Sequence, residues 1–344
     1  MALPQQIVGP TPGYLYGNNV SISPTPAESV AGNDTSSGNE LVFSIISWTA
    51  LCVVFVVGVT GNCFVLCMTC RPSSRLSIST INTYVMNLAV ADLTYILAYL
   101  FFTIGNHLPA GWPFGAIGCK VVFSIDFVVM FVGAYILVAM SIERFVAIVY
   151  PMKSLQCRSV PCSRWVCGCL WAIGIIAIAL PYCLNYETKF YEDEGKTMCD
   201  WTQSEEVYKK YFTAVFVIVL VIPSVMMSLV YASLLIHFWR TVGQVGASLN
   251  KNLRRSKRRV VTVVFLIVLA FWVCYIPFWT FAMVNLYTED GIHNRPLGLF
   301  CIILSYINSC VNPLLYTLLT NKFNRWRESK KSSRSTSKIA LRSV

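Results

Sequence analysis

One carboxylate, Asp126, stands inside a long apolar stretch, and this placement predicts a binding site for a cation. A charge inside a membrane-type apolar segment is costly, so it usually faces the interior of a helix bundle and marks a ligand or ion path. Eighteen residues separate Asp126 from Arg144, which corresponds to roughly 27 Å along a helix. Asp126 therefore lies far from the end of the stretch that carries Arg144. The alternative is a structural carboxylate that pairs with a neighbouring hydroxyl.

The composition of the chain is that of a membrane protein. It has 344 residues, of which 56% are hydrophobic and 12% charged, whereas about a quarter of a soluble domain is charged. Each of the long apolar runs could cross a hydrocarbon core of about 30 Å as a helix, and none alternates as barrel strands do. These runs are 42–70, 80–104, 116–149, 163–184, 208–240, 257–286 and 296–320. We therefore predict an all-α membrane protein, a seven-transmembrane helix bundle.

The distribution of basic residues predicts the orientation of the bundle. Residues 1–41 are rich in Pro, Gly, Ser, Thr and Asn, contain no Lys or Arg, and lack the apolar core of a signal peptide. Arg71 and Arg75 follow the first run directly, which places the N-terminus outside and, with an odd number of helices, the C-terminus inside. We expect a disordered extracellular tail over 1–41, a membrane domain over 42–320, and a cytoplasmic amphipathic helix and tail over 321–344.

Covalent modifications are expected on the outer side. Asn19 and Asn33 each begin an Asn-X-Ser/Thr glycosylation acceptor in the exposed tail. Cys119 at the outer end of the third run and Cys199 in the loop after the fourth both face the oxidising side and can form a disulfide. Cys183, near the outer end of the fourth run, is the competing partner.

Several classes of protein are excluded or disfavoured. The net charge of +11 comes mainly from basic residues that flank the apolar runs, which disfavours a nucleic-acid-binding protein. There is no cluster of metal ligands, and the histidines at 107, 237 and 293 give no set for an enzyme. A transporter or channel is the alternative from a different class. It would carry several charges along a path, whereas only Asp92 and Asp126 lie deep in the runs.

Motifs in all the apolar runs resemble those of the rhodopsin-like (class A) G-protein-coupled receptors. These motifs are Gly61-Asn62, Leu88-Ala89-Val90-Ala91-Asp92, Glu143-Arg144-Phe145, Trp171, Pro223 with Tyr231, Phe271 with Cys274 and Pro277, and the segment from Asn308 through Asn312-Pro313 to Tyr316. Three stretches also resemble the urotensin II receptors, in the peptide-binding branch that includes somatostatin and opioid receptors. They run from Phe114 to Phe127, from Phe271 to Trp279, and from Asn308 to Thr320.

The resemblance implies a conformational switch at the inner ends of the helices. Arg144 would pair with Glu143 in the inactive state and turn toward a G protein in the active state. Prolines inside helices break backbone hydrogen bonds and act as hinges. The residues assigned to this switch are Glu143, Arg144, Tyr231, Tyr275, Pro277, Asn312, Pro313 and Tyr316. Tyr275 replaces the tryptophan that most members of the family carry.

Four polar residues in different runs are expected to share a network, because unpaired polar groups are costly in an apolar interior. They are Asn62, Asp92, Asn308 and Asn312. The resemblance implies that such a cluster holds sodium in the inactive state. Gly133, however, stands where a serine hydroxyl would help to coordinate the ion. Sodium binding is therefore in doubt, and no other metal or cofactor is expected.

The resemblance places an aromatic box around Asp126, made of Met130, Phe278, Trp279 and Tyr306. A carboxylate with aromatic neighbours suits an ammonium or guanidinium group. The fifth run has apolar Val215, Phe216 and Val219 where a catecholamine receptor would present serines. We therefore expect a cyclic, urotensin II-like peptide whose lysine reaches Asp126. A somatostatin-like peptide or a biogenic amine is the alternative, and retinal is excluded because 296–320 contains no lysine.

The remaining expectations concern partners and location. The resemblance implies a heterotrimeric G protein as partner, with signalling through phospholipase C and calcium, and implies arrestin and receptor kinases acting on the serine-rich tail. Phe323 and Trp326 fit a short amphipathic helix that docks on membrane lipid. The predicted location is the plasma membrane.

Overall fold

The computed structural model describes residues 33–70, 80–108, 111–150, 152, 159–192, 195–244, 251–288, 292 and 294–319. Among these residues seven helical segments are long and apolar enough to cross a membrane, so the predicted seven-helix fold is confirmed. Asn19 and the predicted amphipathic helix and tail over 321–344 lie outside the described residues.

Five spans are single helices and two are interrupted. The single helices are α1 (Asn33–Cys70), α2 (Thr80–His107), α3 (Gly115–Val149), α9 (Lys251–Tyr287) and α10 (Arg295–Leu319). The fourth span runs through α5 (Val160–Gly174), the π-helix η3 (Ile175–Ala179) and α6 (Leu180–Asn185). The fifth runs through α7 (Glu205–Phe216), η4 (Val217–Val221) and α8 (Ile222–Gln244). Since α1 begins at Asn33, the helix extends into 33–41, which we had predicted to be part of the tail.

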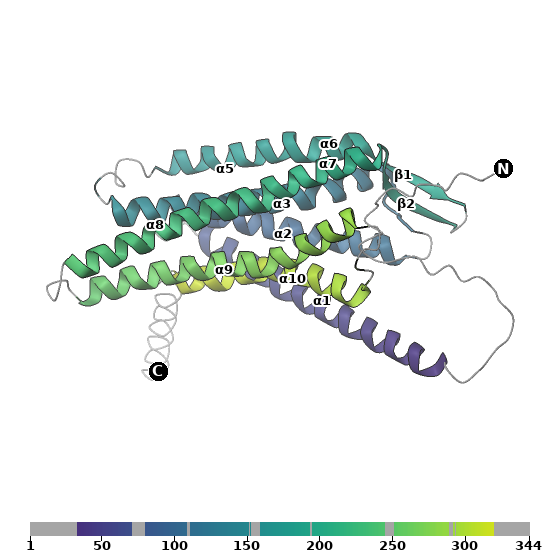
Figure 1. Cartoon of the computed structure of the whole chain (residues 1–344), viewed down its shortest axis with the longest axis horizontal. Helices are drawn as coiled ribbons and strands as arrows, with labels where there is room; N and C mark the ends of the chain where they lie inside the picture. The colour runs from purple at the N-terminus through teal and green to yellow at the C-terminus, as the bar shows by residue number, and fades with distance from the viewer. Residues whose placement is uncertain are drawn as a thin grey trace, which may run out of the picture.

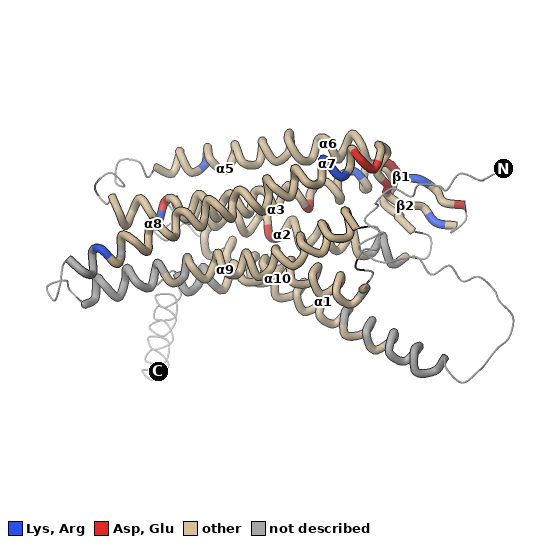
Figure 2. Tube along the Cα trace, in the orientation of Figure 1, with Lys and Arg blue, Asp and Glu red and all other residues tan. Residues whose placement is uncertain are grey.

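The helix α3 lies at the centre of the bundle (Figure 1), in contact with α2, α5, η3, α8 and α9. Its span has the largest buried share of the seven. Charged residues of the described part lie mainly at the two ends of the bundle, and the middle is almost free of them (Figure 2). A charge placed on the central helix therefore has protein around it instead of lipid, as expected for intramembrane carboxylates.

A short β-hairpin, absent from the all-α prediction, covers one end of the bundle. Strands β1 (Tyr186–Tyr191) and β2 (Lys196–Trp201) pair antiparallel, with Thr188 opposite Cys199. Trp112 donates its backbone N–H to the carbonyl of Thr197 at 2.7 Å. Gly111 approaches the same residue with φ of +81°, and a Cβ there would meet the Thr197 carbonyl oxygen at 2.1 Å, so only glycine fits.

A disulfide between Cys119 and Cys199 ties the hairpin to α3. It resolves the choice left open by the sequence, because Cys183 is a free thiol. The Cys183 sulfur lies 3.4 Å from the Ser124 hydroxyl instead. The outer end of α3 and the hairpin thus form one covalently linked unit over the bundle.

Hydroxyl groups from neighbouring helices bind carbonyls of the two π-helical segments. Tyr211 donates to the Ile178 carbonyl in η3 at 2.8 Å, and Tyr135 on α3 donates to the Ile218 carbonyl in η4 at 3.1 Å. A π-turn disturbs the regular hydrogen-bond ladder, and in a membrane span its free carbonyls need donors from within the protein. These tyrosines therefore help to fix the geometry of the fourth and fifth spans.

We expect Tyr135→Phe to lower the free energy of unfolding by about 1 kcal/mol, because it removes one interhelical hydrogen bond. The melting temperature of the detergent-solubilised protein measures this effect. Thr60→Val is the control, since within the described part of the chain the Thr60 hydroxyl bonds only to carbonyls of its own helix. An equal loss in both variants would contradict a special role for the Tyr135 contact.

Candidate ligand site and polar network

Asp126 lies on the wall of a cavity of about 70 Å³ between the bundle and the hairpin. Aromatic side chains form most of this wall, and the spans that contribute are α2, α3, α6, α7, α9 and α10. The lining residues are Tyr95, Tyr99, Phe102, Phe123, Asp126, Phe127, Met130, Tyr182, Tyr186, Tyr208, Phe212, Phe278, Ile302, Ser305 and Tyr306. One carboxylate therefore faces an almost wholly aromatic chamber.

The Oδ1 atom of Asp126 is buried and has no hydrogen-bond partner among the described residues. The alternative expectation, a carboxylate held by a neighbouring hydroxyl, finds no support at this atom. A buried carboxylate oxygen without a donor is strongly unfavourable. A cationic group that enters the cavity would supply the missing partner.

The walls beside Asp126 are stacked rings. Tyr306 stacks on Tyr95 with ring centroids 4.4 Å apart and lies 3.9 Å from Tyr99. On the other side Phe127 stacks on Tyr182 at 5.2 Å, with an angle of 9° between the rings. Ring faces attract cations, and the attraction grows when water is excluded. The chamber therefore suits an ammonium or guanidinium group.

Three of the four residues predicted around Asp126 line the cavity: Met130, Phe278 and Tyr306. The fourth, Trp279, is not among the lining residues. It is completely buried, with its ring 5.3 Å from that of Phe212 and 5.8 Å from that of Phe127. Trp279 thus supports the aromatic wall from behind, at the position of the proline-containing turn of α9.

Sequence reasoning missed much of the aromatic lining. Tyr95 and Tyr99 follow Asp92 by three and seven residues, so helical periodicity places all three on one face of α2. That spacing could have identified the two tyrosines. The hairpin residue Tyr186 gave no such signal, because its place over the cavity depends on how the loop folds back.

Asp200, which we did not single out, organises the hairpin. Its carboxylate accepts hydrogen bonds from the Tyr191 hydroxyl at 2.5 Å and from the Trp201 backbone N–H at 2.8 Å. The Lys189 ammonium lies 3.6 Å away. Asp200 is buried, so this acidic residue serves the fold of the loop. Glu192, in the turn of the hairpin, is exposed, whereas residues 193–194 lie outside the described chain.

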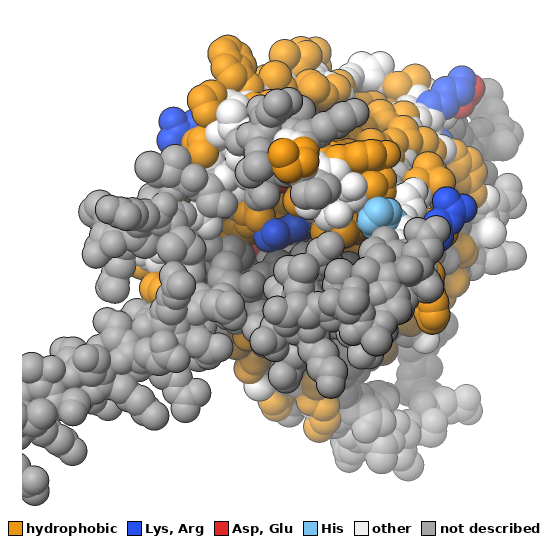
Figure 3. Space-filling model, turned by 90° about the vertical axis from the view of Figure 1, so that its left-hand side faces the viewer, with side chains coloured by type: hydrophobic (Ala, Val, Ile, Leu, Met, Phe, Trp, Pro, Cys, Tyr) orange, Lys and Arg blue, Asp and Glu red, His pale blue; other side chains and the backbone are white. Residues whose placement is uncertain are grey.

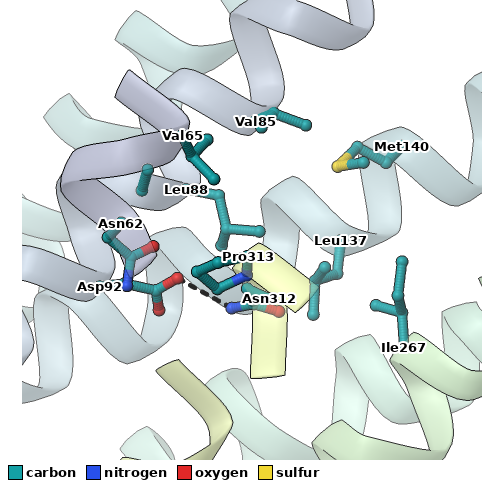
Figure 4. Close-up of a pocket in the computed structure, with 11 residues that line it drawn as sticks. Asn62, Val65, Val85, Leu88, Asp92, Leu137, Met140, Ile267, Asn312 and Pro313 are labelled. Atoms are coloured by element: carbon teal, nitrogen blue, oxygen red, sulfur yellow. Dashed lines mark hydrogen bonds between the residues drawn. The ribbon is translucent and has the colours of Figure 1, made fainter. Parts of the chain in front are cut away.

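A second polar site lies deeper, where α1, α2 and α10 meet. Asn312 donates to the Asp92 carboxylate at 2.9 Å, and Asn62 donates to the Ser309 carbonyl at 3.0 Å. Figure 4 shows Asn62, Asp92 and Asn312 together beside Pro313, with apolar side chains around them. Asn308 donates to the Tyr275 hydroxyl at 3.4 Å. The structure thus brings the residues of the predicted network together and adds Tyr275 to it.

These sites occur in a chain whose residues 61–316 match the family model of the 7 transmembrane receptor (rhodopsin family). The chain belongs to this family. It is 32% identical to the Urotensin-2 receptor of Macaca mulatta over 293 residues, which is 84% of this chain and 72% of that protein. It is 29% identical to the Galanin receptor 2b of Danio rerio (82% of this chain, 74% of that protein) and 29% identical to the Somatostatin receptor type 1 of Mus musculus (87% and 75%).

Membership of the rhodopsin family makes the chain a multi-pass membrane receptor and not an enzyme. The end of the bundle opposite the hairpin is where α3 ends, beside the predicted switch residues Glu143 and Arg144. Figure 3 looks onto that end and shows basic side chains among hydrophobic ones. Arg164 and Arg240 are exposed there.

The structure describes part of the predicted switch. Glu143 accepts a hydrogen bond from the hydroxyl of Thr80 on α2. Tyr231 is buried in α8, and Pro277 and Pro313 lie inside α9 and α10. The pairing of Glu143 with Arg144, and the role assigned to Tyr316 on α10, stay predictions.

The site of the sodium ion that the family implies lacks one oxygen ligand here, because Gly133 stands where a serine would supply it. The chamber that Asp92 shares with Gly133, Tyr275 and Asn308 has a volume of about 10 Å³, which is roughly the minimum for one water molecule. Gly133 contributes no oxygen, and Asp92 already accepts a hydrogen bond from Asn312. The Ser309 hydroxyl also lines this chamber and has no hydrogen-bond partner among the described residues. With Gly133 in place of a serine, a cation would still have one oxygen ligand fewer than the family pattern, so we expect weak sodium binding.

We expect the agonist response of the receptor to change less than about threefold when potassium replaces sodium, and Gly133→Ser to create a dependence on sodium. A Cβ at Gly133 would meet only the Leu88 side chain, at 3.8 Å, so serine fits and brings a hydroxyl toward Asp92. Gly133→Ala, which adds the carbon without the oxygen, is the control. Strong sodium dependence in the unmodified receptor would contradict this prediction.

Proposed function

We propose that the chain is a cell-surface receptor for a cationic peptide, and that it activates a heterotrimeric G protein after a ligand ammonium pairs with Asp126. The observation that carries this proposal is the buried Oδ1 of Asp126, which has no partner among the described residues and lies in an aromatic cavity. The similarity to receptors named for urotensin-2, galanin and somatostatin supports a peptide as ligand.

The size of the cavity favours one long side chain. Its volume of about 70 Å³ holds about five water-sized groups, if each needs roughly 10–15 Å³. A lysine side chain has about that number of heavy atoms. The rest of a peptide would then lie against the hairpin and the outer ends of the helices.

The fifth span disfavours a catecholamine. Val215 and Val219 are buried in the bundle, and the ring of Phe216 packs 5.5 Å from that of Trp279. The fifth-span residues that reach the cavity are Tyr208 and Phe212. Their aromatic rings suit an apolar stem with a terminal charge better than a catechol. A biogenic amine of another kind remains the second candidate.

The proposed orientation places the hairpin outside the cell and the basic end inside. A disulfide at the hairpin end agrees with the oxidising extracellular side. In this orientation Asn19 and Asn33 are available for glycosylation, and the C-terminal serines are available to receptor kinases and arrestin. The proposed pathway runs through phospholipase C and calcium at the plasma membrane.

The test is the calcium response of cells that express the receptor, challenged with cyclic lysine-containing peptides of the urotensin-2 and somatostatin type, with galanin, and with biogenic amines. Cyclic AMP is measured in parallel to detect other G proteins. We expect a lysine-containing peptide to activate the receptor and its norleucine analogue to be at least about a hundredfold weaker. A response to amines alone would favour the second candidate.

A further inference from the structure

A second side chain with an unpartnered polar atom lines the same cavity as Asp126. The hydroxyl of Tyr182, on α6, has no hydrogen-bond partner among the described residues, and Tyr182 is 1% exposed. Its side chain lines the cavity together with Asp126. A buried hydroxyl without a partner costs free energy, so native proteins rarely keep one without a reason.

The ring of Tyr182 is held on all sides by other rings. It stacks on Phe127 and on Tyr186, with centroids 5.2 and 5.3 Å away. The rings of Tyr211 and Trp201 meet it edge-on at 5.2 and 5.9 Å. A ring held in this way cannot swing its hydroxyl to another partner without breaking several contacts. The unpaired donor is therefore built into the site.

The neighbouring Tyr211 differs from Tyr182 because its hydroxyl has a hydrogen-bond partner. Its hydroxyl belongs to the same aromatic cluster but donates to the Ile178 carbonyl at 2.8 Å. Tyr211 therefore needs no further acceptor and lies outside the cavity lining. Of these two tyrosines, only Tyr182 has a donor to offer to a molecule in the cavity.

We propose that Tyr182 is a specificity-determining residue, whose hydroxyl donates a hydrogen bond to an oxygen of the ligand while Asp126 binds the ligand's ammonium. This inference rests on the proposed function and adds to it the chemical class of the ligand. The ligand must carry a primary ammonium and, within about one side-chain length, a carbonyl oxygen. A lysine residue with its adjoining peptide carbonyls meets both conditions, whereas a simple alkylamine meets only the first.

The experiment uses the purified full-length receptor and two probes, Nα-acetyl-lysine N-methylamide and n-pentylamine. Both carry an ammonium on a flexible chain, and only the first carries carbonyl oxygens. Thermal stabilisation as a function of probe concentration gives an apparent Kd for each. We expect the blocked lysine to bind roughly three- to tenfold more tightly than pentylamine, the range for one net hydrogen bond.

The ratio of the two Kd values in variants decides the proposal. Tyr182→Phe keeps the ring and removes the hydroxyl, so we expect the advantage of the blocked lysine to disappear while pentylamine binds as before. Tyr211→Phe is the matched control and should keep the advantage. Asp126→Asn should weaken both probes, which tests the proposed function separately.

Three results would overturn the assignment of Tyr182. The blocked lysine could have no advantage in the unmodified receptor, or its advantage could survive in Tyr182→Phe or vanish equally in Tyr211→Phe. In each case the loss of pentylamine binding in Asp126→Asn would leave the proposed function standing. Failure of both probes to stabilise the unmodified receptor would overturn the role of Asp126 as well.

Discussion

Asp126→Asn should reduce the potency of the activating peptide by at least about a hundredfold while the receptor still reaches the cell surface. The substitution keeps the shape of the side chain and removes its charge. Loss of one partner of a buried charge pair costs about 2–5 kcal/mol, and about 2.8 kcal/mol corresponds to a factor of a hundred. Calcium responses, with surface receptor counted by antibody on the same cells, measure the effect.

The same substitution, which lowers potency, should keep or raise the thermal stability of the ligand-free receptor. In the ligand-free receptor the Asp126 oxygen is buried without a partner among the described residues, so removing its charge relieves an unfavourable term. We expect the melting temperature of the ligand-free Asp126→Asn protein to equal or exceed that of the unmodified receptor. Asp126→Glu, which keeps the charge on a longer side chain, should retain part of the response. A lower melting temperature together with unchanged potency would show that Asp126 is a structural residue.

Replacing both Cys119 and Cys199 by serine should remove most peptide binding at the cell surface. The bond joins residues 80 apart in sequence, and closing a loop of that length stabilises a protein by about 4.5 kcal/mol in the chain-entropy view. It also holds the hairpin that places Tyr186 over the cavity. We expect both fewer receptors at the surface and weaker binding by those that arrive there.

Cys183→Ser is the control for the disulfide, because Cys183 is a free thiol near the same end of the bundle. Its replacement should leave binding within about twofold, since a thiol and a hydroxyl fill the site near Ser124 similarly. Saturation binding with labelled peptide, normalised to surface receptor, separates lower expression from lower affinity. Normal binding by the double serine variant would mean that hairpin packing alone forms the site.

The sequence alone was sufficient for the membrane fold. Long apolar runs must form helices in lipid because each backbone group needs a partner within its own segment. The position of Asp126 within such a run predicted the candidate ligand site, because a charge inside a membrane span usually marks a ligand or ion path. Asp92 and the asparagines Asn62, Asn308 and Asn312 could be grouped because unpaired polar groups in different helices must find one another.

The tertiary structure decided what depends on contacts between distant segments. In the structure Cys119 is bonded to Cys199 and not to Cys183. Trp279 lies behind the aromatic wall, and the Tyr182 hydroxyl has no partner among the described residues. Local sequence could not provide these results, because the face that a side chain presents to the cavity depends on how helices cross and on the π-turn in each of the fourth and fifth spans. Periodicity specifies which residues share a helix face, and only packing specifies what that face meets.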